Sequence, residues 1–266
     1  MARMVLLGML SAMLPLLSLA EFVAPFVVTP QRDVERMMRL ADIGPGDYVI
    51  DLGSGDGRIV ITAAERGAMG HGIELDPGLV REARLRAEGA GVADRVAFVN
   101  EDLFQSDFSR ATVVTMYLMP DVVMRLRPIL FETLAPGTRI VSNSFDMGDW
   151  RPEQHVSAAV SGGLFLWIVP ADVSGHWTVT IDGHGEPMRL EVDQHFQDIE
   201  PRLEGRDQGY FMEDVRLHAD RIDFHAVNRH RSYRFSGRVE GDRMLGYVHI
   251  QEGDEVAVAH WQAVRS

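Results

Sequence analysis

The chain has 266 residues, 46% of them hydrophobic, which is enough to bury one large core or two smaller ones. Its 26 basic and 39 acidic residues give a formal charge of −13, which argues against a general electrostatic grip on nucleic acid or anionic lipid. Cysteine is absent, and this excludes disulfides, zinc-thiolate sites and thiol nucleophiles.

The first twenty residues have the layout of a secretory signal peptide. Arg3 precedes an uncharged apolar run over residues 4–20, and Ser18 and Ala20 are small residues suited to a cleavage site. The alternative is an uncleaved anchor, because residues 22–28 would extend the run far enough to cross about 30 Å of hydrocarbon. We therefore expect residues 1–20 to be a signal peptide or membrane anchor, and the protein to be exported (periplasmic) or membrane-associated. Arginines that follow the run would favour the cytoplasmic face for an anchored protein, so that face stays open.

Predicted helices and strands then alternate as far as residue 142. Apolar residues at helical spacing predict helices at 30–41, 58–66, 77–89 and 121–134. Short apolar or β-branched runs predict strands at 48–50, 72–75, 95–99, 112–116 and 138–142. This alternation implies right-handed βαβ units. We predict an α/β fold with a Rossmann-like, doubly wound, mostly parallel sheet, and a ligand crevice at the carboxyl ends of its strands.

The pattern changes in the second half of the chain. Residues 164–169 are predicted to complete the sheet. Seven short alternating segments without helical period follow, at 177–181, 188–196, 215–217, 222–227, 233–239, 244–250 and 256–261. They predict a smaller C-terminal antiparallel all-β domain, a barrel or a sandwich, over residues 172–266, after an α/β domain over residues 21–171.

The ends of the β domain carry a weak signature. Gly175-His176-Trp177 at its start and Arg265 near its end resemble the Gly-x-Trp start and closing Arg of lipocalin-type barrels. The alternative is a substrate-docking or membrane-proximal module.

The turn after the first predicted strand is rich in glycine. It has the pattern Gly-x-Gly-x-Gly at Gly53, Gly55 and Gly57, whereas dinucleotide sites use Gly-x-Gly-x-x-Gly. Asp51, two residues before the first glycine, would repel a phosphate. It suits the ammonium of the methionine end of S-adenosylmethionine, and the glycines let the backbone approach that ligand closely.

Two further acids follow the next two strands. Glu74 lies 23 residues after Asp51, a spacing that suits a carboxylate accepting hydrogen bonds from both ribose hydroxyls. Asp102 is placed to bind the adenine amino group, with the Leu103 backbone against the ring, although the neighbouring Glu101 is an alternative. Ordinary strand-end or capping acids are the alternative for the first two. The predicted cofactor-binding residues are Asp51, Gly53, Ser54, Gly55, Asp56, Gly57, Glu74, Leu75, Asp102 and Leu103.

Residues 22–169 resemble the seven-stranded class I methyltransferases. The runs Phe26-Val27-Val28-Thr29-Pro30, Asp51-Leu52-Gly53-Ser54-Gly55-Asp56-Gly57-Arg58-Ile59-Val60 and Phe145-Asp146-Met147-Gly148-Asp149-Trp150 are similar to one branch of that class. This branch holds the ATP synthase c-subunit lysine methyltransferases and related prokaryotic protein-lysine methyltransferases. The resemblance implies S-adenosylmethionine-dependent methyl transfer to a protein lysine amine.

Two departures from the pattern leave other acceptors open. Tyr117-Leu118-Met119-Pro120 follows the fourth strand, where many amine methylases have Asn/Asp-Pro-Pro-Tyr/Phe, and the β domain is an addition. A small-molecule or lipid methyltransferase, or a non-catalytic ligand-binding protein, therefore remains the alternative. We expect a protein acceptor, no nucleic-acid partner and, through the N-terminus, membrane association.

Methyl transfer is an in-line displacement at a carbon that the sulfonium activates, so a strong general base is optional. Tyr117, at the end of the fourth strand, is the candidate catalytic residue that positions the acceptor, and an aromatic wall under the cofactor is the alternative. Thr29 and Asp149-Trp150 are candidates to close the site from two rims, with fold support as the alternative. No metal site is expected, because the histidines form no compact ligand pair.

Overall fold

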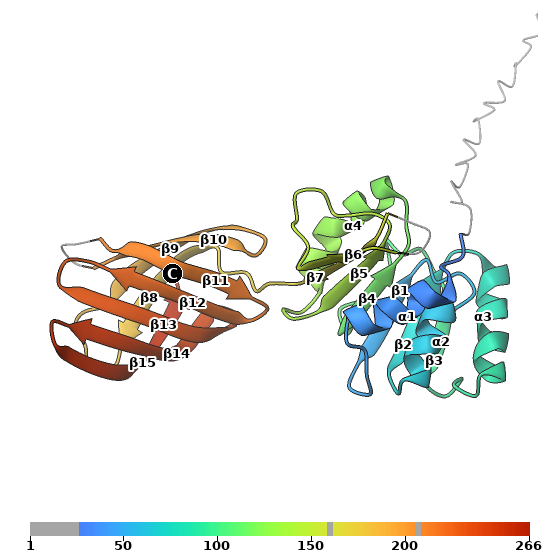
Figure 1. Cartoon of the computed structure of the whole chain (residues 1–266), viewed down its shortest axis with the longest axis horizontal. Helices are drawn as coiled ribbons and strands as arrows, with labels where there is room; N and C mark the ends of the chain where they lie inside the picture. The colour runs from blue at the N-terminus through green and yellow to red at the C-terminus, as the bar shows by residue number, and fades with distance from the viewer. Residues whose placement is uncertain (1–26, 159–161, 206–208) are drawn as a thin grey trace, which may run out of the picture.

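Two sheets joined by a short connection make up the protein (Figure 1). The structure is a computed structural model that describes residues 27–158, 162–205 and 209–266. The predicted signal peptide or anchor lies outside these residues. Within them, no helix is long and apolar enough to cross a membrane.

The first sheet has seven strands in the order β3-β2-β1-β4-β5-β7-β6. Its strands are β1 (Tyr48–Leu52), β2 (Met69–Glu74), β3 (Val96–Asn100), β4 (Val113–Met116), β5 (Arg139–Asn143), β6 (Gln154–Val156) and β7 (Leu164–Ile168). The first five are parallel, whereas β7 runs antiparallel to β5 and to β6. The chain moves outward from β1 through β2 to β3, then returns to β4 on the other side of β1. This reversal places the expected crevice at the carboxyl ends of β1 and β4.

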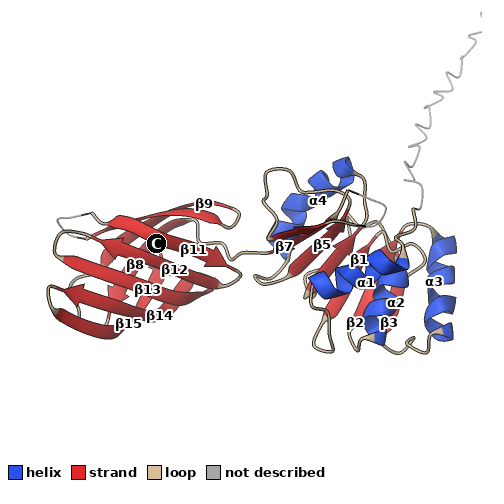
Figure 2. Cartoon of the chain, in the orientation of Figure 1, coloured by secondary structure: helices blue, strands red, loops and turns tan. Residues whose placement is uncertain are grey.

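Helices cover both faces of this sheet, as the predicted doubly wound architecture requires (Figure 2). They are α1 (Gln31–Leu40), α2 (Arg58–Glu65), α3 (Pro77–Gly89) and α4 (Pro120–Thr133). Val49 and Val113 pack with α1 and α2, whereas the adjacent Ile50 and Val114 belong to the core that includes α4. Period-two alternation with apolar residues on both faces explains why these strands appear in the sequence as continuous apolar runs. The predicted α/β fold class is confirmed.

The second sheet is an eight-stranded antiparallel near-barrel. Its strands are β8 (Gly175–Ile181), β9 (Met188–His195), β10 (Asp198–Glu204), β11 (Phe211–His218), β12 (Arg221–Val227), β13 (Arg231–Glu240), β14 (Arg243–Glu252) and β15 (Glu255–Arg265). Strands β8 to β10 pair in succession, as do β11 to β15, and β15 pairs with β8, so β10 and β11 are the two edges of the sheet. Between β10 and β11 the described residues contain one bridge, Glu204–Gly209. The sequence predicted a barrel or a sandwich for this domain, and the structure shows a near-barrel.

Two strands were absent from the sequence prediction. β10 alternates charged residues with only Ile199 and Leu203 as aliphatic ones, and Pro201 in its middle argues against a strand. β6 consists of three exposed residues that pair only with the edge of β7. The prediction of seven strands in the β domain was therefore wrong, because β10 owes its place to pairing with β9 rather than to its own composition.

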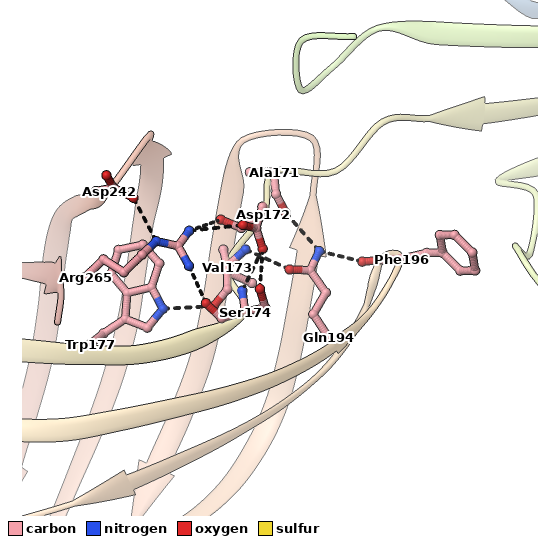
Figure 3. A network of polar contacts seen from close by, with 9 residues as sticks. All are labelled: Ala171, Asp172, Val173, Ser174, Trp177, Gln194, Phe196, Asp242 and Arg265. Carbon is pink, nitrogen blue, oxygen red and sulfur yellow. Dashed lines mark hydrogen bonds and ion pairs between the residues drawn. The ribbon is translucent and has the colours of Figure 1, made fainter. Parts of the chain in front are cut away.

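The residues that resemble the lipocalin pattern are in contact at one end of the barrel (Figure 3). The guanidinium carbon of Arg265 lies 4.3 Å from the centroid of the Trp177 ring. Arg265 also donates to the carbonyls of Asp172 (2.9 Å) and Ser174, and its Nε lies 2.8 Å from a carboxylate oxygen of Asp242. The last strand is thereby tied to the segment that enters the first.

Replacing Arg265 with methionine should lower the free energy of unfolding of the barrel by about 2–3 kcal/mol, because two backbone carbonyls lose a charged donor. Arg234→Met is the control, since Arg234 pairs with Asp214 where both side chains are exposed and such pairs contribute about 1 kcal/mol or less. Thermal and urea unfolding would check both variants. Equal unfolding midpoints for Arg265→Met and wild type would contradict the assigned role.

Candidate active site

One cavity of about 320 Å³ lies at the carboxyl ends of β1, β2 and β4. This size lies within the range of about 300–1,000 Å³ typical of small-molecule sites. It brings together most of the residues predicted from the sequence: Asp51, Gly53, Ser54, Asp56, Glu74, Leu75, Asp102, Leu103 and Tyr117. Gly55 and Gly57 are not among its lining residues.

Asp51 is the buried acid of this cavity. It is 2% exposed, and one of its carboxylate oxygens accepts a 2.7 Å hydrogen bond from the Thr115 hydroxyl. Burial raises the pKa of Asp51 to about 7, against the hydrogen bond from Thr115, and the carboxylates of Glu74 and Asp56 add to the increase. A cation bound beside it would favour the charged form, which is the chemistry that an amino-acid ammonium supplies.

This pKa predicts a pH-dependent affinity for S-adenosylhomocysteine, whose ammonium requires the ionised carboxylate. Below about pH 7 the ligand must displace a proton from Asp51. Its affinity should therefore increase with pH, approaching about tenfold per unit well below the pKa, and level off above it. The free protein should lose stability over the same rise in pH, since its folded state holds a proton that the unfolded state releases. Calorimetry across this window would check the effect, and a pH-independent affinity in wild type would contradict it.

Glu74 braces the glycine loop. One of its carboxylate oxygens accepts a 2.8 Å hydrogen bond from the Gly55 N–H and the other a 2.9 Å bond from the Asp76 N–H. Gly55 thus contributes through its backbone, behind the cavity wall. Glu74 itself also lines the cavity, and its binding of the ribose stays a prediction.

Glycine is required at the other two positions of the loop, Gly53 and Gly57, for different physical reasons. Both have positive φ, 75° at Gly53 and 79° at Gly57. A Cβ on Gly53 would lie 2.9 Å from Leu118, which also lines the cavity, whereas a Cβ on Gly57 would lie 2.6 Å from the Phe98 ring. Gly53 therefore keeps the cavity open, and Gly57 allows α2 to begin close against β3.

Asp56 has charged protein partners. It lies 2.5 Å from Arg58 and 3.1 Å from Arg86. Burial alone would raise its pKa, but the hydrogen bonds and charge of Arg58, with the charge of Arg86, hold the pKa of Asp56 below its usual value. Arg58 also donates to the Thr29 carbonyl at 3.0 Å, and Thr29 lines the cavity. The Asp56 carboxylate thus holds the arginine that secures the rim at Thr29.

Asp102 shapes the turn after β3. One of its carboxylate oxygens accepts from the Phe104 N–H at 3.0 Å and the other from the Gln105 side chain at 3.1 Å. Glu101 lies in the cavity wall as well, so both acids that were considered as partners of adenine line the cavity. Phe104, which the sequence analysis did not select, adds an aromatic wall there.

The donor set fits the zwitterionic and nucleoside parts of S-adenosylmethionine. Ser54 is 6% exposed and lines the cavity, and its hydroxyl oxygen has no hydrogen-bond partner among the residues that the structure describes. A buried polar atom of this kind indicates a ligand group or ordered water. Thr115, which holds Asp51, was missed by the sequence analysis. Its signal was a hydroxyl within the otherwise apolar β4, on the strand adjacent to Asp51.

Tyr117 lines the cavity just past the end of β4 and stacks on Phe145, with ring centroids 6.4 Å apart and an angle of 29° between the planes. Asp149 and Trp150 do not line the cavity. Trp150 is 1% exposed in the core beneath α4, and Asp149 is ion-paired with Arg127. The hypothesis that these two residues close a rim was wrong, because the indole is withdrawn into the apolar core.

Known proteins match somewhat more than half of this chain. A model described as the ANTKMT methyltransferase domain matches residues 51–154. A protein-lysine N-methyltransferase of Saccharolobus islandicus is 42% identical over 150 residues, 54% of this chain and 93% of that protein. An adenine nucleotide translocase lysine N-methyltransferase of Mus musculus is 36% identical over 168 residues, 62% of this chain and 69% of that protein.

A solved structure agrees with these matches. A structure described as an RNA methyltransferase from Salinibacter ruber, in complex with S-adenosyl-L-homocysteine, is 53% identical, with a TM-score of 0.54, over 55% of this chain and 96% of that chain. Fold, cavity and matches together define an S-adenosylmethionine-dependent methyltransferase. The chain belongs to the methyltransferase family of the archaeal and mouse enzymes, which confirms the resemblance inferred from the sequence, and S-adenosylmethionine is its cofactor.

Proposed function

We propose that the enzyme transfers a methyl group to the side-chain amine of a lysine in a protein acceptor. The observation that carries this proposal is the match to the archaeal and mouse lysine N-methyltransferases, and the charge of the cavity wall agrees with it. Among the described residues that line the cavity, Arg58 is the one basic residue, against six acidic ones: Asp51, Asp56, Glu74, Asp76, Glu101 and Asp102. Such a wall attracts a cationic amine and repels phosphate. The names of the archaeal and mouse relatives support the same acceptor class.

The reaction requires alignment and removal of water more than strong acid–base chemistry. When bound, the cofactor supplies a methyl group activated by the sulfonium. The lysine must first lose its proton to water, which burial beside the Tyr117 and Phe145 rings favours, because desolvation lowers the pKa of an amine. With the cofactor held by Asp51, Glu74 and the glycine loop, the neutral amine would take up its methyl group, and the sulfonium sulfur would keep the electrons of the broken C–S bond. Tyr117 aligns the amine from the end of β4.

Transfer from labelled cofactor to cell extracts tests the acceptor. We expect discrete labelled protein bands whose hydrolysate contains methyl-lysine. All 26 basic residues of this chain are arginine, so methyl-lysine cannot come from the enzyme itself. RNA is the second candidate acceptor, favoured by the description of the Salinibacter structure. Label removed by ribonuclease, or confined to small molecules, would refute the protein-lysine proposal.

We further propose that the N-terminal apolar segment holds the enzyme at the cytoplasmic face of a membrane. Arg32, Arg36 and Arg39 follow that segment, which favours retention of the following domain in the cytoplasm. S-adenosylmethionine is also made there. A fusion of residues 1–40 to a reporter active only outside the cytoplasm should sediment with membranes and be inactive. An active reporter would favour export.

A further inference from the structure

The turn between β9 and β10 of the barrel packs into the core of the methyltransferase domain. The Phe196 ring stacks on Trp150, with centroids 5.2 Å apart and an angle of 9° between the planes. It meets the edge of Phe131 at 5.7 Å, and the guanidinium carbon of Arg127 lies 5.3 Å from its centroid. A side chain of the barrel thus completes the apolar cluster beneath α4.

Polar contacts surround this aromatic stack. His195 lies 3.2 Å from a carboxylate oxygen of Asp149, and Arg151 lies 3.0 Å from Asp198. The Gln197 side chain donates to the Arg151 carbonyl at 2.8 Å. The segment from residue 147 to residue 151 is therefore held between α4 on one side and the turn of the barrel on the other.

The turn is held in place from within the barrel (Figure 3). The Gln194 side chain accepts from the Val173 N–H at 2.7 Å and donates to the carbonyls of Ala171 at 2.9 Å and Phe196 at 2.7 Å. Phe196 has a φ of 55°, a conformation that costs a non-glycine residue about 1–2 kcal/mol. A glycine would relieve this strain. The residue found there has an aromatic ring, which indicates that the ring has a use outside the turn.

The held segment follows closely on a residue that contacts the cavity wall at Tyr117. Phe145, which stacks on Tyr117, lies two residues before Met147. The Met147 carbonyl accepts a 2.7 Å hydrogen bond from Arg127, whose guanidinium also lies over Phe196. Contacts on Met147 and Trp150 therefore fix this segment, and the Phe145 ring lies two residues before it.

We infer that Phe196 is a positioning residue for the acceptor: through Trp150 and the 147–151 segment it fixes the Tyr117–Phe145 pair, the wall along which a lysine side chain reaches the methyl group. The archaeal relative is 93% covered by a match that spans 54% of this chain, so methyl transfer does not by itself require a barrel of this size. The assignment of that acceptor as a lysine rests on the function proposed above.

The experiment compares Phe196→Ala, Phe196→Gly and Phe196→Tyr in the full chain. Phe211→Ala is the matched control, because Phe211 is another barrel phenylalanine and is 81% exposed. Loss of the ring should raise the KM for poly-L-lysine about tenfold in the alanine and glycine variants, with a much smaller change in kcat. The tyrosine and control variants should behave as wild type, and all four should bind S-adenosylhomocysteine with unchanged affinity.

The glycine variant separates the ring from the turn. If Phe196 served only the turn, glycine would relieve the strained φ and leave KM unchanged, which would overturn the inference. Hydrogen exchange of residues 144–151 gives a readout that does not depend on the acceptor. We expect faster exchange there in the alanine and glycine variants only. If exchange is faster but wild type does not methylate poly-L-lysine, the positioning role of Phe196 is supported and the proposed lysine acceptor is not. Unchanged exchange in the alanine and glycine variants would refute the positioning role.

Discussion

Replacing Asp51 with alanine is expected to weaken S-adenosylhomocysteine binding by about 2–5 kcal/mol, the cost of truncating one partner of a buried charged contact. The carboxylate is 2% exposed and held by Thr115, so its position is set before the ligand arrives. Water cannot easily replace a fixed acid in so buried a position, and the ligand ammonium would lose its counter-charge.

Isothermal calorimetry on three variants would test this role of Asp51. Asp51→Asn keeps the shape of the side chain and removes the charge, so it should lose most of the affinity and all of the pH dependence below about pH 7. Asp94→Ala is the control, because Asp94 is an exposed acid just before β3, at the opposite end of that strand from the cavity. Wild-type affinity in Asp51→Ala would show that the ammonium is bound elsewhere.

Glu74→Ala should produce a loss of similar size, about 2–5 kcal/mol in ligand affinity, but for two reasons. The variant removes the carboxylate expected to bind the ribose. It also leaves the N–H groups of Gly55 and Asp76 without their acceptor, which loosens the glycine loop. Unlike loss of Asp51, loss of Glu74 should therefore lower the unfolding temperature of the ligand-free protein as well.

Glu74→Gln separates these two effects. Its amide oxygen can accept from only one of the two N–H groups, so the loop should be partly restored while the ligand still loses a charged acceptor. Glu82→Ala is the control, since Glu82 pairs with Arg86 on the exposed face of α3. An unchanged affinity and unfolding temperature in Glu74→Ala would contradict both roles.

Local sequence determined most of the first domain and much of its candidate site. Strands buried on both faces are apolar along their length. The end of each apolar run therefore predicts where the strand ends and which residues follow it. Asp51, Glu74 and Asp102 were selected for this reason, and parallel strands then bring their ends to one edge. Gly53 and Gly57 were selected because a residue without a side chain lets the backbone approach a ligand closely. Their positive φ, which the structure shows, is a second local requirement that favours glycine.

Contacts between distant segments decided the rest. Asp56 has a glycine-loop sequence context that suits a ligand, yet α3 brings Arg86 to it. Trp150 ends the run 145–150 and was predicted to close the site at one rim. In the structure it packs under α4 and against Phe196 of the barrel. β10 forms because β9 lies beside it. In each case the residue's contacts depended on which distant segment lies beside it in the folded protein. Side-chain type and spacing along the chain do not predict which distant segment that is.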